Sequence, residues 1–307
     1  MRILITGASG LLGLNLALET TYRHTVFGTV NHHLLNTDAF SVIQTDLLAP
    51  GAVEHMLEST HPDWVIHCAA LANLEACEAD PLLAQQMNTD LPRTLASYVA
   101  RSGARLVHIS TDAVFDGLRG SYTEQDIPTP ACVYSRTKLE GERAVAEADP
   151  SAIIARVVFY GWSLEGRRSL AEFFFNNLSQ GKPVNGFTDV FFCPLQVTDL
   201  ADLLVRMLLM NLSGLYHVVS SEALSKYEFG MRLAQRFALD GNLINPISIT
   251  QAQLIAARSP NLTLRSDKLA EALGESLPSI STGLDKFYTL YQQGYPQRLH
   301  AMGLTSG

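Results

Sequence analysis

The chain opens with a short apolar strand that runs into a glycine-rich turn and then into an apolar helix. Residues 3–5 form the apolar run, and Gly7, Gly10 and Gly13 punctuate the segment that follows. Glycine lets the backbone take a positive φ and lets a ligand approach the main chain, and free N–H groups at a helix start attract negative charge. The segment therefore predicts a turn that holds the pyrophosphate of a dinucleotide. On the glycines alone, a turn without a ligand stays open.

Strand and helix patterns alternate along the first 157 residues. This alternation predicts an α/β fold with a doubly wound parallel sheet, covered by helices on both faces. The further strands are expected at 25–30, 41–44, 64–67, 104–109 and 152–157, and the helices between them at 51–59, 81–100 and 133–148. Asn88, inside the second of these helices, is expected to brace nearby loops through its amide.

The pattern changes after residue 157. We expect a dinucleotide-binding domain at 1–157 and a smaller, mostly helical substrate lobe at 158–307, with about 187–213 returning to the large domain. Short strands are expected at 186–191 and 215–218, and the tail at 251–291 reads as mostly helical. Helix starts are expected at a capping box of Ser169 with Glu172, at Thr198, and at Ser225 with Glu228.

Composition favours small ligands over macromolecular ones. The net charge of -8 argues against a nucleic-acid partner, which would require clustered Lys and Arg. No apolar run approaches the roughly 18 residues of a membrane span, so no membrane partner is expected. The four cysteines lack C-x-x-C spacing and indicate neither a disulfide framework nor a metal site. We expect a cytoplasmic, reduced protein without a targeting segment.

The end of the second expected strand bears on the choice of cofactor. An acidic residue at this position accepts hydrogen bonds from the ribose of NAD, whereas a 2′-phosphate prefers basic neighbours. The chain places Asn31, His32 and His33 there, with no carboxylate. This favours NADPH, with NADH still possible, although solvated loop histidines explain the pattern equally well.

Later strand ends supply further candidate cofactor contacts. Asp46, beside Leu47, is placed to accept a hydrogen bond from an adenine amino group. Ala69 and Ala70 follow the strand at 64–67, where small side chains let a cofactor lie close, although packing alone also explains two alanines.

Tyr134 and Lys138 lie four residues apart on the helix expected at 133–148, so their side chains share one helix face. A phenol with an ordinary pKa near 10 carries protons poorly at neutral pH unless a nearby cation favours the phenolate. Thr111 closes the strand before this helix, at the sheet edge where ligands bind. Together with the glycine turn, these residues predict a site for chemistry on a carbonyl or hydroxyl group.

Motifs along nearly the whole chain resemble the dTDP-4-dehydrorhamnose reductase (RmlD-like) family of extended short-chain dehydrogenases. They are TGASGLLG, HCAALANLEACEADP, HISTDAVFDG, SYTEQDIPTPACVYSRTKLEGER, FFCPLQVTDLAD and, at 258–269, RSPNLTLRSDKL. The resemblance implies a Rossmann-like fold and an NAD(P)H-dependent reductase of a nucleotide-linked 4-keto-sugar. Tyr134 would be the general acid, Lys138 would bind the nicotinamide ribose and lower the phenol's pKa, and Thr111 would bind the reacting carbonyl. The implied cofactor contacts are Gly7, Ser9, Gly10, Leu11, Leu12, Gly13, Asn31, His32, Asp46, Leu47, Ala69, Ala70, Tyr134 and Lys138.

One departure from the family pattern limits the activity. The family usually has Tyr after the Thr-Asp pair, and related 4,6-dehydratases have Glu, but this chain has Ala113. Ala113 removes one substrate contact and argues against dehydration. The aromatics Phe159, Tyr160, Trp162, Phe191 and Phe192 are expected to be mostly core residues.

Two other functions remain open from the sequence. A nucleotide-sugar epimerase would use the same residues and retain tightly bound NAD. Regulatory subunits similar to this family, such as the one that partners methionine adenosyltransferase, use the fold to bind a protein. The sugar, its nucleotide, any metal and the assembly state, a homodimer included, are not determined by the residues.

Overall fold

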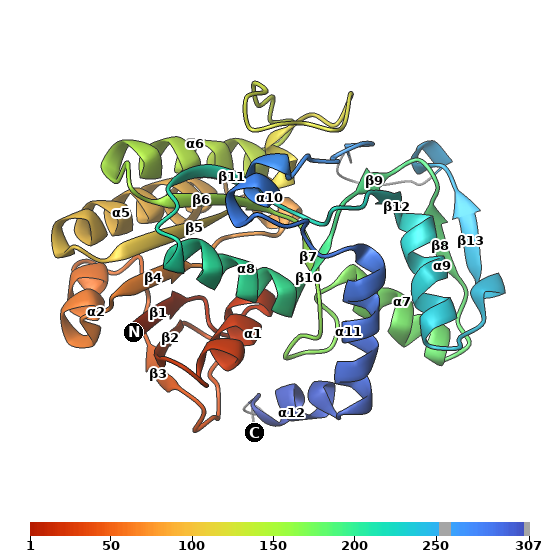
Figure 1. The fold of residues 1–307 in the computed structure, drawn as a ribbon, viewed down its shortest axis with the longest axis horizontal. Coiled ribbons are helices and arrows are strands. Elements are labelled where there is room, and N and C mark those ends of the chain that lie inside the picture. Colours follow the sequence, from red (N-terminus) through yellow and green to blue (C-terminus); the bar gives the residue numbers. More distant parts are fainter. Residues whose placement is uncertain (252–258, 304–307) are drawn as a thin grey trace.

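A central sheet of seven parallel strands organises the computed structural model, which describes residues 1–251 and 259–303. The strand order is β11-β6-β5-β4-β1-β2-β3, so the chain winds outward in both directions from β1 (Figure 1). This confirms the predicted doubly wound α/β fold. The strands are β1 (Arg2–Thr6), β2 (Thr25–Val30), β3 (Ser41–Gln44), β4 (Trp64–His67), β5 (Arg105–Thr111), β6 (Ile153–Val157) and β11 (Gly214–Val218).

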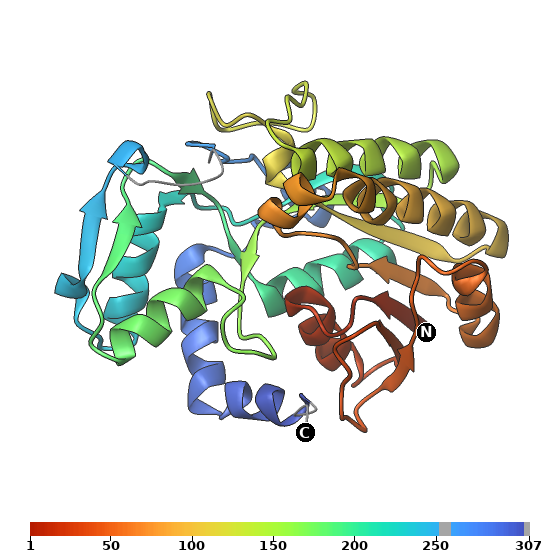
Figure 2. The same ribbon diagram turned by 180° about the vertical axis from the view of Figure 1, so that it is seen from behind.

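Helices cover both faces of this sheet. The helices α2 (Ala52–Thr60), α5 (Leu91–Ser102) and α6 (Val133–Ala148) pack on one face, and α1 (Leu11–Thr20) and α8 (Val197–Leu209) on the other (Figures 1 and 2). Successive side chains of a strand point to opposite faces, so Leu4 packs with the α2–α5 layer while Ile3 and Ile5 pack with α1 and α8. Both faces are therefore apolar, as a buried parallel sheet requires.

The helix predicted at 81–100 is confirmed and consists of three consecutive helical segments without a break. They are α4 (Pro81–Gln85), a π-helical turn (Gln86–Asp90) and α5, and a further short helix, α3 (Leu74–Ala79), precedes them. Asn88 lies in the π-helical turn, where its Nδ2 donates to the Leu71 carbonyl at 3.0 Å and to Thr137 Oγ1 at 3.1 Å. The Leu71 N–H donates to Asn88 Oδ1 at 2.9 Å. The amide of Asn88 thus braces the loop after β4 against α6, as expected.

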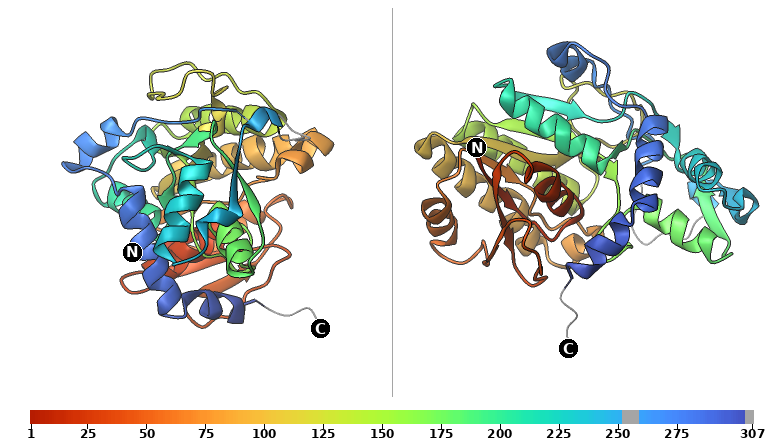
Figure 3. Two further views of the ribbon diagram at one scale, coloured as in Figure 1. Left: turned by 90° about the vertical axis from the view of Figure 1, so that its right-hand side faces the viewer. Right: turned by 60° about the horizontal axis from the view of Figure 1, so that its bottom comes forward.

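A second lobe is built mainly from the later part of the chain (Figures 1 and 3). Its helices α7 (Leu170–Ser179) and α9 (Lys226–Arg236) pack together beside the paired strands β8 (Val184–Phe187) and β13 (Ile244–Ile247). The helix α11 (Ile280–Gln292) contacts α9. Capping boxes at Ser169 with Glu172 and at Ser225 with Glu228 are both confirmed. The elements of this lobe are β7 (Phe159–Tyr160), α7 (Leu170–Ser179), β8 (Val184–Phe187), β9 (Phe191–Phe192), β12 (Leu224–Ser225), α9 (Lys226–Arg236), β13 (Ile244–Ile247), α10 (Asp267–Leu273), α11 (Ile280–Gln292) and α12 (Tyr295–Ala301), with short 3-10 turns Asp112–Val114, Gly241–Leu243 and Ile249–Gln251.

Part of the second half joins the large sheet. The strand β11 pairs with β6 as the edge strand of the large sheet, and α8 packs against α1. The strand β10 (Leu195–Gln196) pairs with β7 in a separate two-stranded sheet. The returning segment thus includes β11, beyond the expected 187–213, while β8 pairs with β13 in the second lobe. The cap expected at Thr198 was wrong, because Gln196 Oε1 accepts from the Thr198 N–H at 2.6 Å and is the cap of α8.

The tail contains more irregular structure than expected. Its described part holds α10 and α11, and the segment between them is not helical. Residues 252–258 of the predicted tail lie outside the described residues, and Arg258 among them is the first residue of the RSPNLTLRSDKL motif. Across 1–251 and 259–303, no helix has both the length and the apolar character needed to cross a bilayer.

Candidate active site

The glycine turn after β1 has a backbone that only glycine fits at two positions. Gly7 has a φ of 68°, and its carbonyl accepts from the Gly10 N–H at 2.9 Å. A Cβ at Gly13 would lie 2.2 Å from the Gly7 oxygen, closer than any real contact allows. The first turn of α1 is therefore pressed against the turn that precedes it.

The start of α1 suits an anion. Gly10 is its N-cap with no side-chain cap, and the first turn carries no acidic residue. The first N–H groups of a helix lack partners within the helix, so this end presents donors and a positive dipole. The residues present thus fit a dinucleotide's pyrophosphate.

Two adjoining hollows meet at this turn. The first, which we call the histidine hollow, has a volume of about 230 Å³, and the second, the helix hollow, about 480 Å³. The histidine hollow is lined by Gly7, Ser9, Gly10, Thr29, Val30, Asn31, His32, His33, Thr45, Asp46, Leu47, Cys68, Ala69, Ala70, Met87 and Arg168. The helix hollow is lined by Gly7, Gly10, Leu11, Leu12, Gly13, Cys68, Ala70, Ala72, Asn73, Ile109, Phe159 and Arg168.

Every cofactor contact expected from the sequence, other than Tyr134 and Lys138, lines one of these hollows. The structure adds residues that sequence reasoning missed. Cys68 follows β4 and Ile109 lies near the end of β5, a position that could have pointed to them, whereas Met87 lies in the π-helical turn. Arg168 comes from the second lobe, and no local pattern in the sequence connects it to the glycine turn.

Thr111 ends β5 and begins the 3-10 turn Asp112–Val114. Its Oγ1 donates to Asp112 Oδ1 at 3.0 Å and accepts from the Ala113 N–H at 3.1 Å. Thr111 and Asp112 are both buried. Burial raises the pKa of Asp112 to about 6, although the hydrogen bond from Thr111 opposes that shift.

Tyr134 is the second residue of α6 and is half-buried. Burial raises the pKa of its phenol well above the ordinary value; a hydrogen bond with Thr111 lowers it, and the charge of Asp112 adds to the increase. The sequence had led us to expect a pKa lowered by Lys138. In the folded chain without a cofactor the pKa of Tyr134 is raised instead, because desolvation of the phenolate outweighs the contacts that stabilise it.

Lys138 lies one turn further along α6 and is only 3% exposed. Its Nζ donates to the carbonyl of Ile109 at 2.7 Å, and Ile109 lines the helix hollow. Burial lowers the pKa of Lys138 to about 8, and the carboxylate of Glu142 opposes the shift. The ammonium is thus held against the wall of the helix hollow.

A buried polar network lies behind Lys138. Glu142 forms an ion pair with Arg156, whose Nη2 lies 2.7 Å from Glu142 Oε2, and also accepts from the hydroxyl of Ser110. On the other side His67 and His108 stack with ring centroids 5.6 Å apart, and burial lowers the pKa of both. Both histidines are therefore neutral at neutral pH.

A third hollow, which we call the apolar cavity, has a volume of about 290 Å³ and lies at the junction of the lobes. Phe159 lines both this cavity and the helix hollow, and Asp112 lines the cavity beside Ala113. The cavity is lined by Leu74, Asp112, Ala113, Ala131, Cys132, Ser135, Val158, Phe159, Leu170, Val190, Phe191, Phe192, Lys226, Ser259 and Leu262. Tyr160, Trp162 and Phe192 are core residues, as expected for most of these aromatics, and Phe192 also lines the cavity with Phe159 and Phe191.

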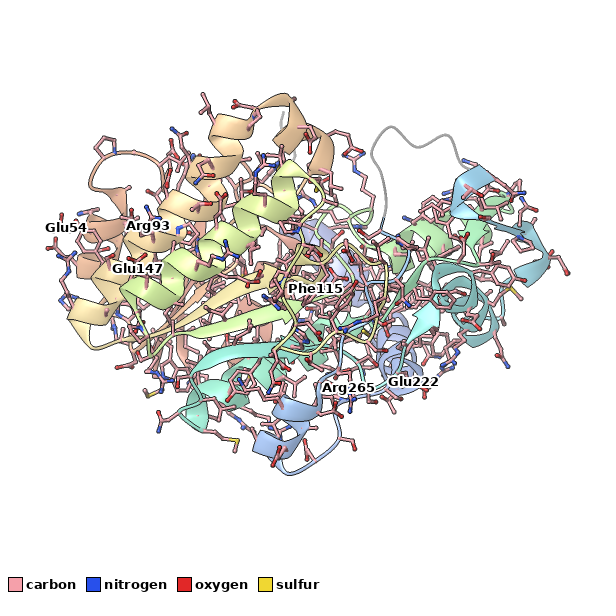
Figure 4. The ribbon with its side chains drawn as sticks, turned by 90° about the horizontal axis from the view of Figure 1, so that it is seen from above. Glu54, Arg93, Phe115, Glu147, Glu222 and Arg265 are labelled. Carbon is pink, nitrogen blue, oxygen red and sulfur yellow. The ribbon has the colours of Figure 1, made fainter. Side chains whose placement is uncertain are left out.

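The loop after Thr111 is held by a small aromatic core. Phe115 stacks on Tyr122 with centroids 4.1 Å apart and packs in a cluster with Leu139 of α6 and Leu264. Figure 4 shows Phe115 near the middle of the molecule, whereas Glu54 and Glu147 lie at the far end of the large domain. This core fixes the positions of Thr111 and Asp112 relative to α6.

Comparisons with known proteins show the family to which the chain belongs. Residues 1–293 match the family described as RmlD substrate binding domain. Methionine adenosyltransferase 2 subunit beta of Mus musculus is 34% identical, over 89% of this chain and 82% of that protein. The probable low-salt glycan biosynthesis reductase Agl14 of Haloferax volcanii is 31% identical, over 92% of this chain and 96% of that protein.

A solved structure shows the same fold. The dTDP-4-dehydrorhamnose reductase of Bacillus anthracis, in complex with NADP, is 26% identical and has a TM-score of 0.80, over 94% of this chain and 98% of that one. The chain belongs to the RmlD substrate binding domain family and has the fold of the extended short-chain dehydrogenases/reductases.

Proposed function

We propose that the protein is an NADPH-dependent reductase of a nucleotide-linked 4-keto-sugar. The observation that carries the proposal is a convergence at one edge of the sheet. Tyr134 bonds Thr111, Lys138 is anchored to Ile109 on the wall of the helix hollow, and the apolar cavity opens beside Asp112. Tyr134 itself lines none of the three hollows, so the proposal connects the phenol to the apolar cavity through Thr111 and the neighbouring Asp112.

The cofactor assignment is supported by the two hollows. The turn at Gly7 and the uncapped start of α1 fit a pyrophosphate, and Asn31, His32 and His33 line the histidine hollow. These residues present no carboxylate where β2 ends, which favours a 2′-phosphate. The similar Bacillus anthracis reductase is a complex with NADP. A reduced nicotinamide would supply the hydride.

The chain's own residues would manage the proton and the developing charge. Tyr134 is protonated at neutral pH, as an ordinary phenol is, and could donate a proton to the alkoxide that forms at the sugar carbon. Burial raises the pKa of the phenol and so makes it a weaker acid, and the charges of Lys138 and of the bound cofactor would have to oppose that shift. Thr111 orients that phenol. Lys138, held by Ile109, would place a positive charge beside the ribose and the alkoxide.

The apolar cavity would receive the sugar. Its wall is largely aliphatic and aromatic, and Asp112, Ser135 and Lys226 are among its polar residues. Such a mixture is typical of ligand sites, in which a few polar groups fix the orientation. Ala113 lines the cavity where the related dehydratases carry Glu, so elimination of water lacks its acid–base group here.

A second candidate is a regulatory subunit that binds nucleotide and a protein partner without catalysis. The 34% identity to methionine adenosyltransferase 2 subunit beta favours it. A third, an epimerase, would retain NAD tightly through purification. Unlike a reductase, neither the regulatory subunit nor the epimerase would oxidise one reduced cofactor for each keto-sugar that is added.

The experiment is NADPH and NADH consumption against a panel of nucleotide-linked 4-keto-sugars. We expect NADPH oxidation with at least one of them, matched by an equal amount of reduced sugar. Tight NADPH binding with no oxidation across the panel would favour the regulatory subunit. Purified protein that already carries NAD would favour the epimerase.

A further inference from the structure

Arg168 reaches the cofactor hollows from the other lobe. It lies on the segment between β7 and α7, yet it lines both the histidine hollow and the helix hollow. Among the described residues that line these two hollows, Arg168 is the one lysine or arginine. Its side chain is 41% exposed, so the guanidinium can meet a ligand that enters from solvent.

The backbone of Arg168 is fixed by a buried carboxylate. Its N–H donates to Glu172 Oε2 at 2.8 Å, and Glu172 is fully buried. The same carboxylate accepts from the N–H and the hydroxyl of Ser163 and from the N–H of Ser169 in the capping box of α7. The root of the side chain is therefore held in place at the end of this loop.

The guanidinium of Arg168 pairs with a carboxylate at the protein surface. Arg168 Nη2 donates to Glu165 Oε1 at 2.6 Å, and Glu165 also pairs with Arg167, which is 79% exposed. A guanidinium has five N–H donors in a planar fork, which suits bidentate binding of a phosphate. Glu165 is thus a surface partner that a stronger anion could replace.

The position within the hollows indicates which phosphate is met. Besides Arg168, the two hollows share Gly7, Gly10, Cys68 and Ala70. Gly7 and Gly10 form the turn before α1, where a pyrophosphate would lie. A 2′-phosphate would instead lie beside Asn31, His32 and His33, which line only the histidine hollow.

We propose that Arg168 is a pyrophosphate clamp, which closes on the cofactor from the second lobe opposite the start of α1. The proposal rests on the proposed nicotinamide cofactor but not on the reduction of a sugar. In binding, the guanidinium exchanges Glu165 for the pyrophosphate oxygens. It also ties the second lobe to the occupied glycine turn.

The test is the affinity of Arg168→Gln for NADPH and NADH, measured by the change in cofactor fluorescence. We expect both to bind about 10- to 100-fold more weakly, by the same factor, because each carries the pyrophosphate. The matched control is Arg167→Gln, which removes a neighbouring arginine that also pairs with Glu165 but lines neither hollow; its affinities should not change. Circular dichroism and the melting temperature establish that each variant is folded.

A second variant tests the clamp without removing it. Glu165→Gln frees Arg168 from its surface partner and should tighten both cofactors a few-fold. Unchanged affinities in Arg168→Gln, or a loss confined to NADPH, would overturn the clamp. Equal loss for both cofactors in a protein that reduces no keto-sugar would leave the clamp standing and remove only the reductase.

Discussion

The hydroxyl of Thr111 donates a hydrogen bond to Asp112, with Oγ1 and Oδ1 3.0 Å apart, and the same hydroxyl is also hydrogen-bonded to Tyr134. A hydrogen bond donated by Thr111 lowers the pKa of the phenol, but Thr111 has one proton and Asp112 competes for it. The charge of Asp112 also raises that pKa directly. Burial is the main cause of the raised pKa of Tyr134, and Asp112 adds to that increase.

Asp112→Asn should therefore lower the pKa of Tyr134. If Tyr134 is the general acid, the alkaline limb of the kcat/KM profile moves to lower pH in this variant, because the phenol loses its proton sooner. Asp202→Asn, which removes an exposed carboxylate of α8, is the charge-matched control and should leave the profile in place. An unmoved limb in Asp112→Asn would separate Asp112 from the acid.

Gly13→Ala should damage the turn and the helix that it begins. Its Cβ would lie 2.2 Å from the Gly7 oxygen, and overpacking of this kind costs about 1–3 kcal/mol. We expect a lower free energy of unfolding in urea and loss of cofactor binding. Gly241→Ala, where the nearest atom to the new Cβ is the terminal methyl of the flexible Met231 side chain at 3.1 Å, should retain cofactor affinity. Normal cofactor binding by Gly13→Ala would contradict the turn's role.

The buried histidines predict a loss of stability in acid. Burial lowers the pKa of His67 to about 3 and that of His108 well below its ordinary value. At mildly acidic pH, the unfolded chain therefore binds protons at these two histidines and the folded chain does not. Below about pH 6.5 the free energy of unfolding should fall by about 1.4 kcal/mol per pH unit for each such histidine.

His108→Leu isolates one of these contributions. Both ring nitrogens of His108 lack a hydrogen-bond partner in the described structure, so little bonding is lost. Urea unfolding between pH 6.5 and 5 should show a slope that is smaller by about one histidine's share. The exposed His55→Gln serves as the control. Equal slopes in the wild type and His108→Leu would show that His108 titrates normally.

Much of the large domain could be predicted from the sequence because its determinants are local. Apolar runs at strand spacing placed β1 to β6, and helix α6 begins and ends where the pattern predicted. The capping boxes of α7 and α9 are equally local, since each needs only a hydroxyl and a carboxylate three residues apart. The cap of α8 was missed because Gln196, a less usual capping residue, is held there as the last residue of β10.

The features that the sequence did not predict depend on contacts between distant segments. Arg168 meets the glycine turn only because the second lobe folds back over the sheet. The raised pKa of Tyr134 depends on burial, which the spacing of Tyr134 and Lys138 cannot reveal. The pairing of β11 with β6 likewise joins segments about sixty residues apart.

The most direct test of the central claim is the rate at which Tyr134→Phe oxidises NADPH with a nucleotide-linked 4-keto-sugar that the wild type reduces. Loss of a general acid should lower kcat by about 10²- to 10⁴-fold, while the affinity for NADPH stays near that of the wild type. Tyr98→Phe, which alters an exposed phenol on α5, should retain full activity. Near-normal turnover by Tyr134→Phe would contradict the account.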